Sequence, residues 1–440
     1  MTARLQAALR KRPPWQRTLI IMFFSQLTSA VGFSLIFPFL PLYVEELSAG
    51  AGLGVEFWSG MVVSAQAFTM MIAAPVWGAL SDRHGRKMMV QRATFGGAVI
   101  IGLMGFVTSA EQLVLLRAIQ GLVTGTVSAA NALVAAVTPR QHTGVAMGTL
   151  QMGLWTGVAV GPLIGGFLSD AFGYQITFVI TGALLFIAGV TVTFGVKEQF
   201  ASKQAAARRT SIIGGWRHVF ATPGVSATFS ARFLSGLSRA MLIPFIPLLV
   251  ALLMPSEDLV NTVTGLIVGV ASGAATFTAV YLGRLGDRVG HRRIFIGSAL
   301  ILAFALLPQS LVTDTWQLLV LRILDGAASG GIVASLSALL AEYSTPGEEG
   351  AVYGLDNASV AASRAVAPLI GSAVALLIGL RGTFVAAGLI SLATALLALR
   401  LIPEPGRLAR SEAGAPTPAL LEREEGSAGG PGLGVKQCGK

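Results

Sequence analysis

Charged residues are scarce in this chain, in which Asp, Glu, Lys and Arg together make up only 12% of 440 residues. An ordinary soluble domain carries about twice that fraction. Hydrophobic residues make up 53% and the mean hydropathy is +0.72, which is more apolar surface than a water-soluble core can bury. Lipid is therefore the expected solvent. Because backbone polar groups in lipid must be paired within their own helix, the sequence predicts an all-α membrane protein.

Cysteine and histidine are also scarce. The single cysteine, Cys438, excludes an intramolecular disulfide. The sequence contains no Ser/His/Asp set, no metal-ligand cluster and no phosphate-binding loop, so we expect neither an enzyme nor a metal site, and no cofactor. A histidine relay inside the membrane is excluded as well, because all four histidines fall in loops between the apolar stretches: His84, His142, His218 and His291.

Long apolar stretches occur throughout the chain. About 20 such residues suffice to cross a bilayer as a helix, and twelve stretches qualify. They cover residues 18–43, 57–80, 90–108, 112–137, 145–168, 175–196, 222–250, 262–283, 293–312, 316–341, 351–379 and 382–402.

Lysine and arginine lie almost entirely on one side of this arrangement. Twelve crossings would place both termini and every second loop on the same side of the membrane. Of the 31 basic residues, 25 fall in these segments, whereas the loops on the opposite side contain only Arg381. The positive-inside rule makes that side the cytoplasm. The net charge of +10 thus reflects topology, and we expect no nucleic-acid partner.

One decapeptide occurs twice. GALSDRHGRK at residues 78–87 recurs as GRLGDRVGHR at residues 283–292, an offset of 205 residues. PFLPL, beginning at Pro38, likewise matches PFIPL, beginning at Pro244. Each half would hold six spans and would begin and end on the same side. The sequence therefore predicts two parallel six-helix repeats related by an axis along the membrane normal.

These boundaries divide the chain into five parts. The stretch between the two repeats is basic and polar, and the C-terminal stretch is rich in Pro, Gly and Glu, a composition typical of disorder. We expect a cytoplasmic N-terminus over residues 1–17, an N-terminal bundle over 18–196, a cytoplasmic linker over 197–221, a C-terminal bundle over 222–402 and a disordered cytoplasmic tail over 403–440.

The whole arrangement resembles the major facilitator superfamily. Residues 78–87 match that superfamily's G-x-L-(A/S)-D-R-x-G-R-(R/K) motif at every defined position, and FSL at Phe33 followed by PFLPLYV resembles MdtG-type multidrug exporters. A second element of the first half is similar to the antiporter motif of the twelve-span drug:proton antiporter family, which we call the exporter motif: Gly157, Gly161, Pro162, Gly165 and Gly166. The equivalent stretch of the second half departs from this motif.

The resemblance implies that the two repeated loops lock the cytoplasmic faces of the bundles and set the conformational equilibrium. A plain basic turn would explain the glycines and the cations but not Asp82 and Asp287, which can pair with cations or cap a helix. The gating residues expected on this basis are Gly78, Asp82, Arg83, Gly85, Arg86, Lys87, Gly283, Asp287, Arg288, Gly290 and Arg292.

The exporter motif places small residues on one helix face, because Gly157, Gly161 and Gly165 follow one another at intervals of four. Such faces let helices pack closely in lipid, and Pro162 can bend the helix. The face either serves ordinary packing or, as the resemblance implies, forms the seam about which the two halves rock during export.

Charged residues inside the spans are candidates for proton coupling. Arg117 and its repeat mate Arg322 either face a cavity or a partner, or extend to the membrane surface. Asp325 follows Arg322 by three residues, so it either forms a structural ion pair or carries the coupling proton. Asp356 is the other acid well inside a span, and the resemblance implies a partner in the loop between spans 2 and 3.

Two acids, Glu45 and Glu46, end the first span at the outer face. They are either solvated or form an outer entry for protons. Other polar and aromatic side chains inside spans are candidates for the lining of a substrate cavity, among them three arginines that favour an anionic substrate. The cavity candidates are Gln26, Phe33, Phe37, Gln66, Asn131, Gln151, Trp155, Arg232, Arg239 and Arg364.

The sequence and the resemblance together predict a secondary active transporter that exports lipophilic or cationic drugs by proton-coupled alternating access. The alternative is a transporter of a specific metabolite such as a sugar or an organic anion. The proton gradient would supply the energy. The expected partners are the lipid bilayer, a small-molecule substrate and protons, and we expect a monomer in the cell inner membrane with both termini in the cytoplasm.

Overall fold

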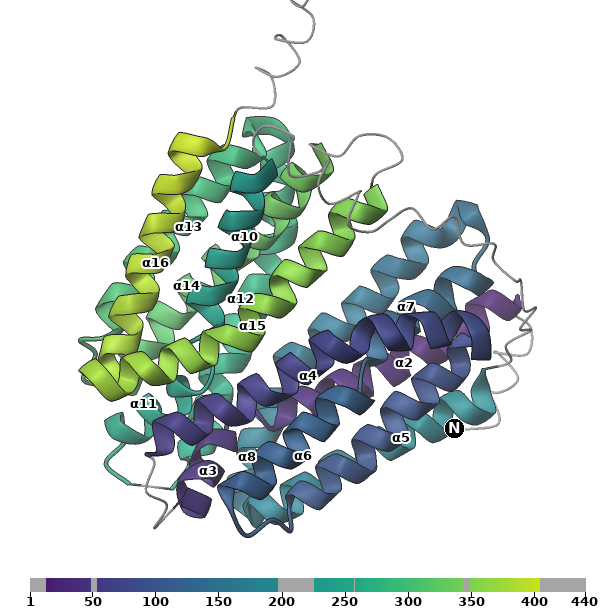
Figure 1. The fold of residues 1–440 in the computed structure, drawn as a ribbon, viewed down its shortest axis with the longest axis horizontal. Coiled ribbons are helices and arrows are strands. Elements are labelled where there is room, and N and C mark those ends of the chain that lie inside the picture. The colour runs from purple at the N-terminus through teal and green to yellow at the C-terminus, as the bar shows by residue number, and fades with distance from the viewer. Residues whose placement is uncertain (1–12, 49–53, 197–224, 257, 343–348, 404–440) are drawn as a thin grey trace, which may run out of the picture.

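The computed structural model describes residues 13–48, 54–196, 225–256, 258–342 and 349–403. Their secondary structure is helical, with no strand among these residues. The two halves of the chain form two bundles, the first coloured from purple to blue and the second from teal through green to yellow in Figure 1. The prediction of an all-α membrane fold in two bundles is confirmed. The linker over 197–221 and almost all of the tail lie outside the described residues.

The first half runs through eight elements: α2 (Pro14–Leu35), α3 (Leu40–Ser48), α4 (Val55–His84), α5 (Arg86–Met104), α6 (Ala110–Val123), α7 (Thr126–Val137), the 3-10 turn η1 (Arg140–His142) and α8 (Thr143–Gly195). The second half runs through seven: α10 (Val225–Ala240), α11 (Phe245–Leu253), α12 (Val260–Val289), α13 (His291–Gln309), α14 (Thr315–Glu342), α15 (Glu349–Ile378) and α16 (Leu380–Leu401).

Helix occupies most of the described part of every predicted span. Nine helical stretches among the described residues are long and apolar enough to cross a membrane by themselves. One of these is the 53-residue α8, which is long enough for two crossings. Its helical geometry is interrupted at Gly173, where φ is 79° and ψ is 168°. Its two arms therefore correspond to the predicted spans 145–168 and 175–196.

Spans 1 and 7 are not the continuous helices that the sequence predicted. Turns at residues 36–39 and 241–244 separate α2 from α3 and α10 from α11. Each turn contains a repeated proline, Pro38 in the first half and Pro244 in the second. Proline has no N–H to donate and disfavours helix in the residue before it. The repeated proline thus accounts for a repeated break.

Glycine sets the turns between several spans. Gly85 and Gly290 have φ values of 96° and 95°, and Gly173 and Gly379 have values of 79° and 81°. Only glycine adopts such values freely, and each pair consists of repeat mates. Gly125, with φ of 133°, breaks span 4 between α6 and α7, which corrects the continuous span over 112–137. The equivalent α14 runs unbroken.

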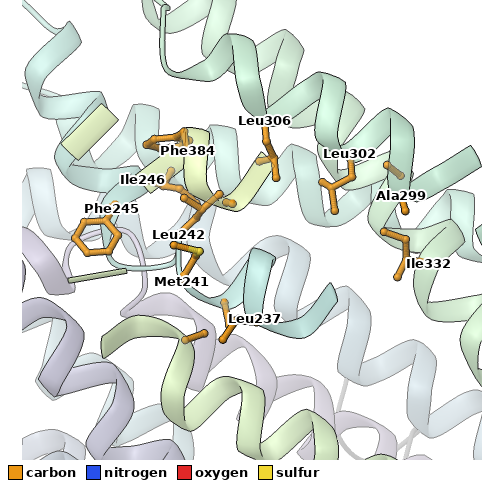
Figure 2. Packing of buried hydrophobic residues seen from close by; sticks show 14 of the residues in the cluster. Leu237, Met241, Leu242, Phe245, Ile246, Ala299, Leu302, Leu306, Ile332 and Phe384 are labelled. Carbon is orange, nitrogen blue, oxygen red and sulfur yellow. The ribbon is translucent and has the colours of Figure 1, made fainter. Parts of the chain in front are cut away.

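The core of the C-terminal bundle gathers around the break between α10 and α11. Phe245, Met241 and Phe384 are fully buried there. Figure 2 shows Met241 of the turn near Leu242 and Ile246, with Phe245 of α11 to one side, and the same cluster includes Phe384 of α16 and Leu302 and Leu306 of α13. The turn at residues 241–244 therefore fills the bundle interior.

The exporter motif packs against the first span. A Cβ atom added at Gly165 would lie 1.8 Å from the Leu35 carbonyl oxygen, and one at Gly161 would lie 1.9 Å from Ser34 Oγ. The Ser34 hydroxyl also donates to the Gly157 carbonyl at 3.0 Å. The face formed by the three glycines therefore lies inside the N-terminal bundle. Of the two alternatives for this face, the three glycines thus follow the first, ordinary packing, because α2 covers them and not a helix of the other half.

The seam uses other residues of the same motif. A Cβ at Gly166 would lie 2.1 Å from the Asn261 carbonyl oxygen, and one at Gly265 would lie 2.2 Å from the Pro162 carbonyl oxygen. Across the second contact between the bundles, Ser372 on α15 donates to the Glu56 carbonyl on α4 at 2.6 Å. Helices α8 and α12, and helices α4 and α15, thus meet at backbone distance.

All these contacts lie at one end of the molecule, which we call the closed end. It contains α3, α11, the start of α12 and Gly173. Towards the opposite end, which carries Gly85 and Gly290, α4 and α15 diverge (Figure 1). Along α12, Gly269 still contacts α8, whereas a Cβ at Gly273 would meet no atom within 4 Å. Among the described residues, the contacts that join the bundles therefore lie towards the closed end.

Gly165→Ala should destabilise the protein strongly, because the added methyl group meets a backbone oxygen that cannot rotate away. Overpacking of this kind costs about 1–3 kcal/mol or more. The measurement is the unfolding temperature in detergent, followed by fluorescence-detected size-exclusion chromatography. Gly148→Ala on the same helix is the control, since no atom lies within 4 Å of its Cβ position. Equal unfolding temperatures for the two variants would contradict the packing described for α8 and α2.

Candidate functional site

One ion pair lies within α14. Arg322 Nη1 donates to Asp325 Oδ2, and the Ser329 hydroxyl donates to Asp325 Oδ1 at 3.2 Å. These residues follow one another at intervals of three and four, so the helix brings them to one face. Asp325 is 5% exposed. The structure therefore contains the ion pair, which was one of the two alternatives predicted for Asp325.

The equivalent arginine of the first half has a different partner. Arg117 on α6 is 1% exposed, and its Nη1 donates to Gln66 Oε1 and Gln120 Oε1, each at 2.9 Å. Gln120 is the repeat mate of Asp325, a relation that the sequence analysis did not notice. The two halves thus share the arginine and the spacing, but only the second supplies a carboxylate. Arg117 Nε and Nη2 have no hydrogen-bond partner among the described residues.

A second ion pair joins two helices. Arg232 Nε on α10 lies 2.8 Å from Asp356 Oδ1 on α15, and Nη2 donates to Oδ2 at 3.2 Å. Asp356 is buried. The expected partner in the loop between spans 2 and 3 is wrong. Because α10 and α15 pack together, the partner is an arginine that the sequence assigned to the substrate cavity.

Two further arginines belong to the same region. Arg239 on α10 and Arg364 on α15 are exposed although both lie in the middle of spans. Arg239 interacts electrostatically with Arg364, Arg232, Arg322 and Asp325. We call the set Arg232, Arg239, Arg322 and Arg364 the basic cluster. Its four arginines face two aspartates, so this part of the C-terminal bundle carries excess positive charge.

The repeated loops attach themselves to the bundle from which they come. Lys87 Nζ donates to the carbonyl oxygens of Thr193 and Val196, at 2.8 and 2.6 Å, where α8 ends. Its counterpart Arg292 donates through Nη2 to the Leu399 carbonyl at 2.7 Å, near the end of α16. A cation is favourable at a helix C-terminus, where carbonyl groups lack partners. Each loop thus caps the last helix of its own half.

Other loop residues behave less symmetrically. Arg86 Nη1 donates to the Ala132 carbonyl at 2.9 Å, whereas Asp287 Oδ1 lies 3.2 Å from His291 Nε2 one turn further on. The repeat mate of Asp287 is Asp82, whose side chain lies outside the described residues together with those of Arg83 and His84. The pairing predicted for Asp82 stays a prediction.

The other candidates for the substrate cavity differ in exposure. Gln26 is buried, and Phe33, Phe37, Gln66 and Asn131 are half-buried. Gln151 and Trp155 lie one turn apart on α8 and are exposed. The acids Glu45 and Glu46 are exposed near the end of α3.

The sequence analysis missed Asp170, which lies four residues after the exporter motif. Its carboxylate accepts hydrogen bonds from Asn261 Nδ2 at 2.7 Å, Thr262 N at 2.7 Å and Thr262 Oγ1 at 2.6 Å. A longer bond of 3.3 Å comes from Asn261 N. The sequence did contain a signal for this contact. Asp170 is an acid shortly before the turn at Gly173, and Asn261 and Thr262, which follow Leu259, are residue types that are common at the start of a helix.

The chain matches the family model of the Major Facilitator Superfamily over residues 22–231 and 228–429. The chain belongs to this superfamily. It is therefore a multi-pass membrane protein and a secondary transporter, not an enzyme.

Curated and solved relatives agree with this assignment. The multidrug resistance protein MdtG of Salmonella arizonae is 34% identical over 379 residues, which cover 86% of this chain and 93% of that protein. The resemblance to MdtG-type proteins is thereby confirmed. In fold, the chain is similar to a D-xylose-proton symporter, with a TM-score of 0.74 and 14% identity over 89% of this chain and 99% of the other. The chain is also similar to the nucleoside transporter NupG, with a TM-score of 0.70 and 16% identity over 87% of this chain and 98% of the other.

Asp325→Asn should lower the unfolding temperature of the detergent-solubilised protein, because it leaves the Arg322 guanidinium without a charged partner. Removing one member of a buried ion pair costs about 3–5 kcal/mol. A second substitution in the same chain, Arg322→Gln, removes the stranded cation and should recover most of the loss. The control is Gln120→Asp, which gives Arg117 a carboxylate and should not destabilise. An Asp325→Asn protein as stable as its parent would show that the pair adds nothing to folding.

Proposed function

We propose that this chain exports lipophilic or cationic drugs by proton-coupled alternating access, from a cell inner membrane in which both termini face the cytoplasm. The observation that supports the substrate class is the 34% identity to a multidrug resistance protein, which extends over 93% of that protein. The intact glycine motif of α8 supports the direction of transport. The 25 basic residues in the terminal and linking segments support the orientation.

This orientation makes the closed end the outer end. The loops that contain Gly85 and Gly290 then lie in the cytoplasm, where the bundles diverge. A drug would enter between the bundles from that side. Export requires the bundles to separate at the outer end and to meet at the inner end. Pro162 and Gly166 of α8 and Gly265 of α12 form the close contact about which such a movement would turn.

The proton must bind on one side and leave on the other. A carboxylate enclosed by protein and lipid takes up a proton when it is isolated, and a neighbouring guanidinium displaces that proton. Movement of the arginine therefore switches proton binding. The Arg322–Asp325 pair lies within one turn of a single helix and moves as a unit. The Arg232–Asp356 pair joins two helices, so a shift of α10 against α15 would separate it, and Asp356 is the better carrier.

Asp356→Asn should abolish uphill accumulation of ethidium in everted vesicles while downhill ethidium exchange continues, because the amide cannot exchange a proton. The measurement is ethidium fluorescence in vesicles with an acidic interior, compared with counterflow without a pH gradient. The matched control is the double variant Arg322→Gln with Asp325→Asn, which removes the other pair and should still accumulate ethidium. Uphill accumulation of ethidium by Asp356→Asn would contradict this assignment and would leave Asp325, Glu45 and Glu46 as the candidate carriers of the coupling proton.

The basic cluster favours a second candidate function, transport of an organic anion. Its excess charge attracts anions and repels cations, and Arg239 and Arg364 are exposed in the middle of their spans. For this function, vesicles should take up carboxyfluorescein. The double variant Arg239→Gln with Arg364→Gln should reduce that uptake at least about tenfold, the effect of losing about 1.4 kcal/mol of binding. Ethidium uptake without carboxyfluorescein uptake by the parent protein would exclude the anion.

A further inference from the structure

Asp170 caps a helix that belongs to the other bundle. Helix α12 begins at Val260, and the residue before it, Leu259, supplies no side-chain cap. The first N–H groups of any helix lack partners within the helix. In α12, the N–H groups of Asn261 and Thr262 donate instead to the Asp170 carboxylate on α8. The capping group thus comes from across the boundary between the bundles.

The charge of Asp170 suits this position. A helix N-terminus carries a partial positive charge that attracts an anion, and α12 is 30 residues long. All four hydrogen-bonding groups around the carboxylate act as donors to it. A carboxylate accepts at both oxygens, whereas a protonated carboxyl group turns one oxygen into a donor. Protonation would therefore remove both the charge attraction and at least one of these bonds.

The backbone at this junction is held tightly. Leu259 has φ of 65°, the one positive value of a non-glycine residue in the described ranges. Such a conformation is costly and persists only where the surroundings enforce it. Close contact between Gly166 and the Asn261 carbonyl brings α8 near enough for the Asp170 carboxylate to reach the start of α12.

Asp170 is accessible from the closed end. It is half-buried and lines a pocket of about 580 Å³ together with Tyr43, Glu46, Tyr174 and Asp258. Glu45, next to Glu46, also acts electrostatically on this region. The residues that line the pocket include no lysine or arginine. A proton from the medium at this end therefore reaches an acidic pocket rather than a basic one.

We propose that Asp170 is the latch of the closed end. Its carboxylate holds the two bundles together by capping α12, and a proton taken up from the medium at that end releases them. The identification of that medium with the cell exterior rests on the proposed orientation. During a cycle, the latch would open as the outer end opens and would form again after the proton has left. An external proton would thus favour the conformation that discharges the drug.

A purely structural cap is the competing explanation, in which Asp170 stabilises α12 equally in every conformation. The two explanations differ in one measurable quantity, the ratio of closed to open outer ends. A latch changes that ratio, whereas a structural cap changes only the unfolding temperature. Spin labels on the two bundles measure the ratio directly and do not require transport of any drug. The result therefore stands even if the proposed substrate class is wrong.

Suitable label positions are Phe106 and Leu311, which are repeat mates beyond the ends of α5 and α13. They are 69% and 77% exposed and lie at the closed end of opposite bundles. The parent for labelling carries Cys438→Ser, Phe106→Cys and Leu311→Cys in the full chain. Double electron–electron resonance in lipid nanodiscs gives the distance distribution at pH 8 and at pH 4, without any substrate.

The parent should show mainly the short distance at pH 8 and a larger share of the longer distance at pH 4, because a carboxylate that accepts four hydrogen bonds takes up a proton only in acid. In Asp170→Asn the longer distance should dominate at both values, with the ratio of open to closed molecules raised about tenfold at pH 8, equivalent to about 1.4 kcal/mol. Asp258→Asn is the matched control, because it removes an acid from the same pocket but none of the hydrogen bonds to α12. It should behave as the parent does.

Thr262→Val provides a milder variant in case Asp170→Asn does not fold. It removes the shortest of the four bonds and keeps the carboxylate, so the open population should rise by less and should still respond to pH. A distance distribution in Asp170→Asn or Thr262→Val equal to that of the parent would overturn the latch. A full response to pH in Asp170→Asn would place the proton on another acid, with Glu45 and Glu46 the nearest, and would overturn the release by protonation.

Discussion

Close approach of helix backbones is the constraint on which the rest of this structure depends. Helices in lipid gain little from the hydrophobic effect when they associate, so they rely on van der Waals contact and interhelical hydrogen bonds. Helix α8 satisfies this constraint on two faces. Gly161 and Gly165 fit against α2 of the same bundle, whereas Gly166 fits against α12 of the other. One motif therefore builds the N-terminal bundle and positions its neighbour.

The way in which buried charges are compensated depends on the same packing, and it differs between the two halves. Arg117 and Arg322 occupy equivalent places, but the first bonds to two glutamines and the second to an aspartate. A duplicated scaffold thus holds an arginine whose charge is compensated in one half only. The pair Arg232–Asp356 exists because α10 and α15 pack together. It joins two helices of the C-terminal bundle, so the two halves differ in the charges that they hold inside their spans.

The ends of the helices determine how the bundles can move. Lys87 and Arg292 cap the final helix of their own halves, which ties each repeated loop to its bundle. Asp170 instead caps the first turn of a helix in the opposite bundle. Contacts within a bundle survive a rigid-body movement, whereas contacts between bundles must break. Under the proposed alternating access, the capping groups would thus mark which parts move together and which parts separate.

The sequence by itself determined the solvent, the repeat and the helices. Its composition requires lipid, its offset of 205 residues requires two similar halves, and repeated residues such as Pro38 and Gly290 locate breaks and turns through their local backbone preferences. Only the tertiary structure decided which helix faces meet. Periodicity shows that Gly157, Gly161 and Gly165 share a face, but not that α2 covers it. Nor could it show that Asp356 meets Arg232 or that Asp170 meets Asn261, because such partners are set by packing between segments distant in the chain.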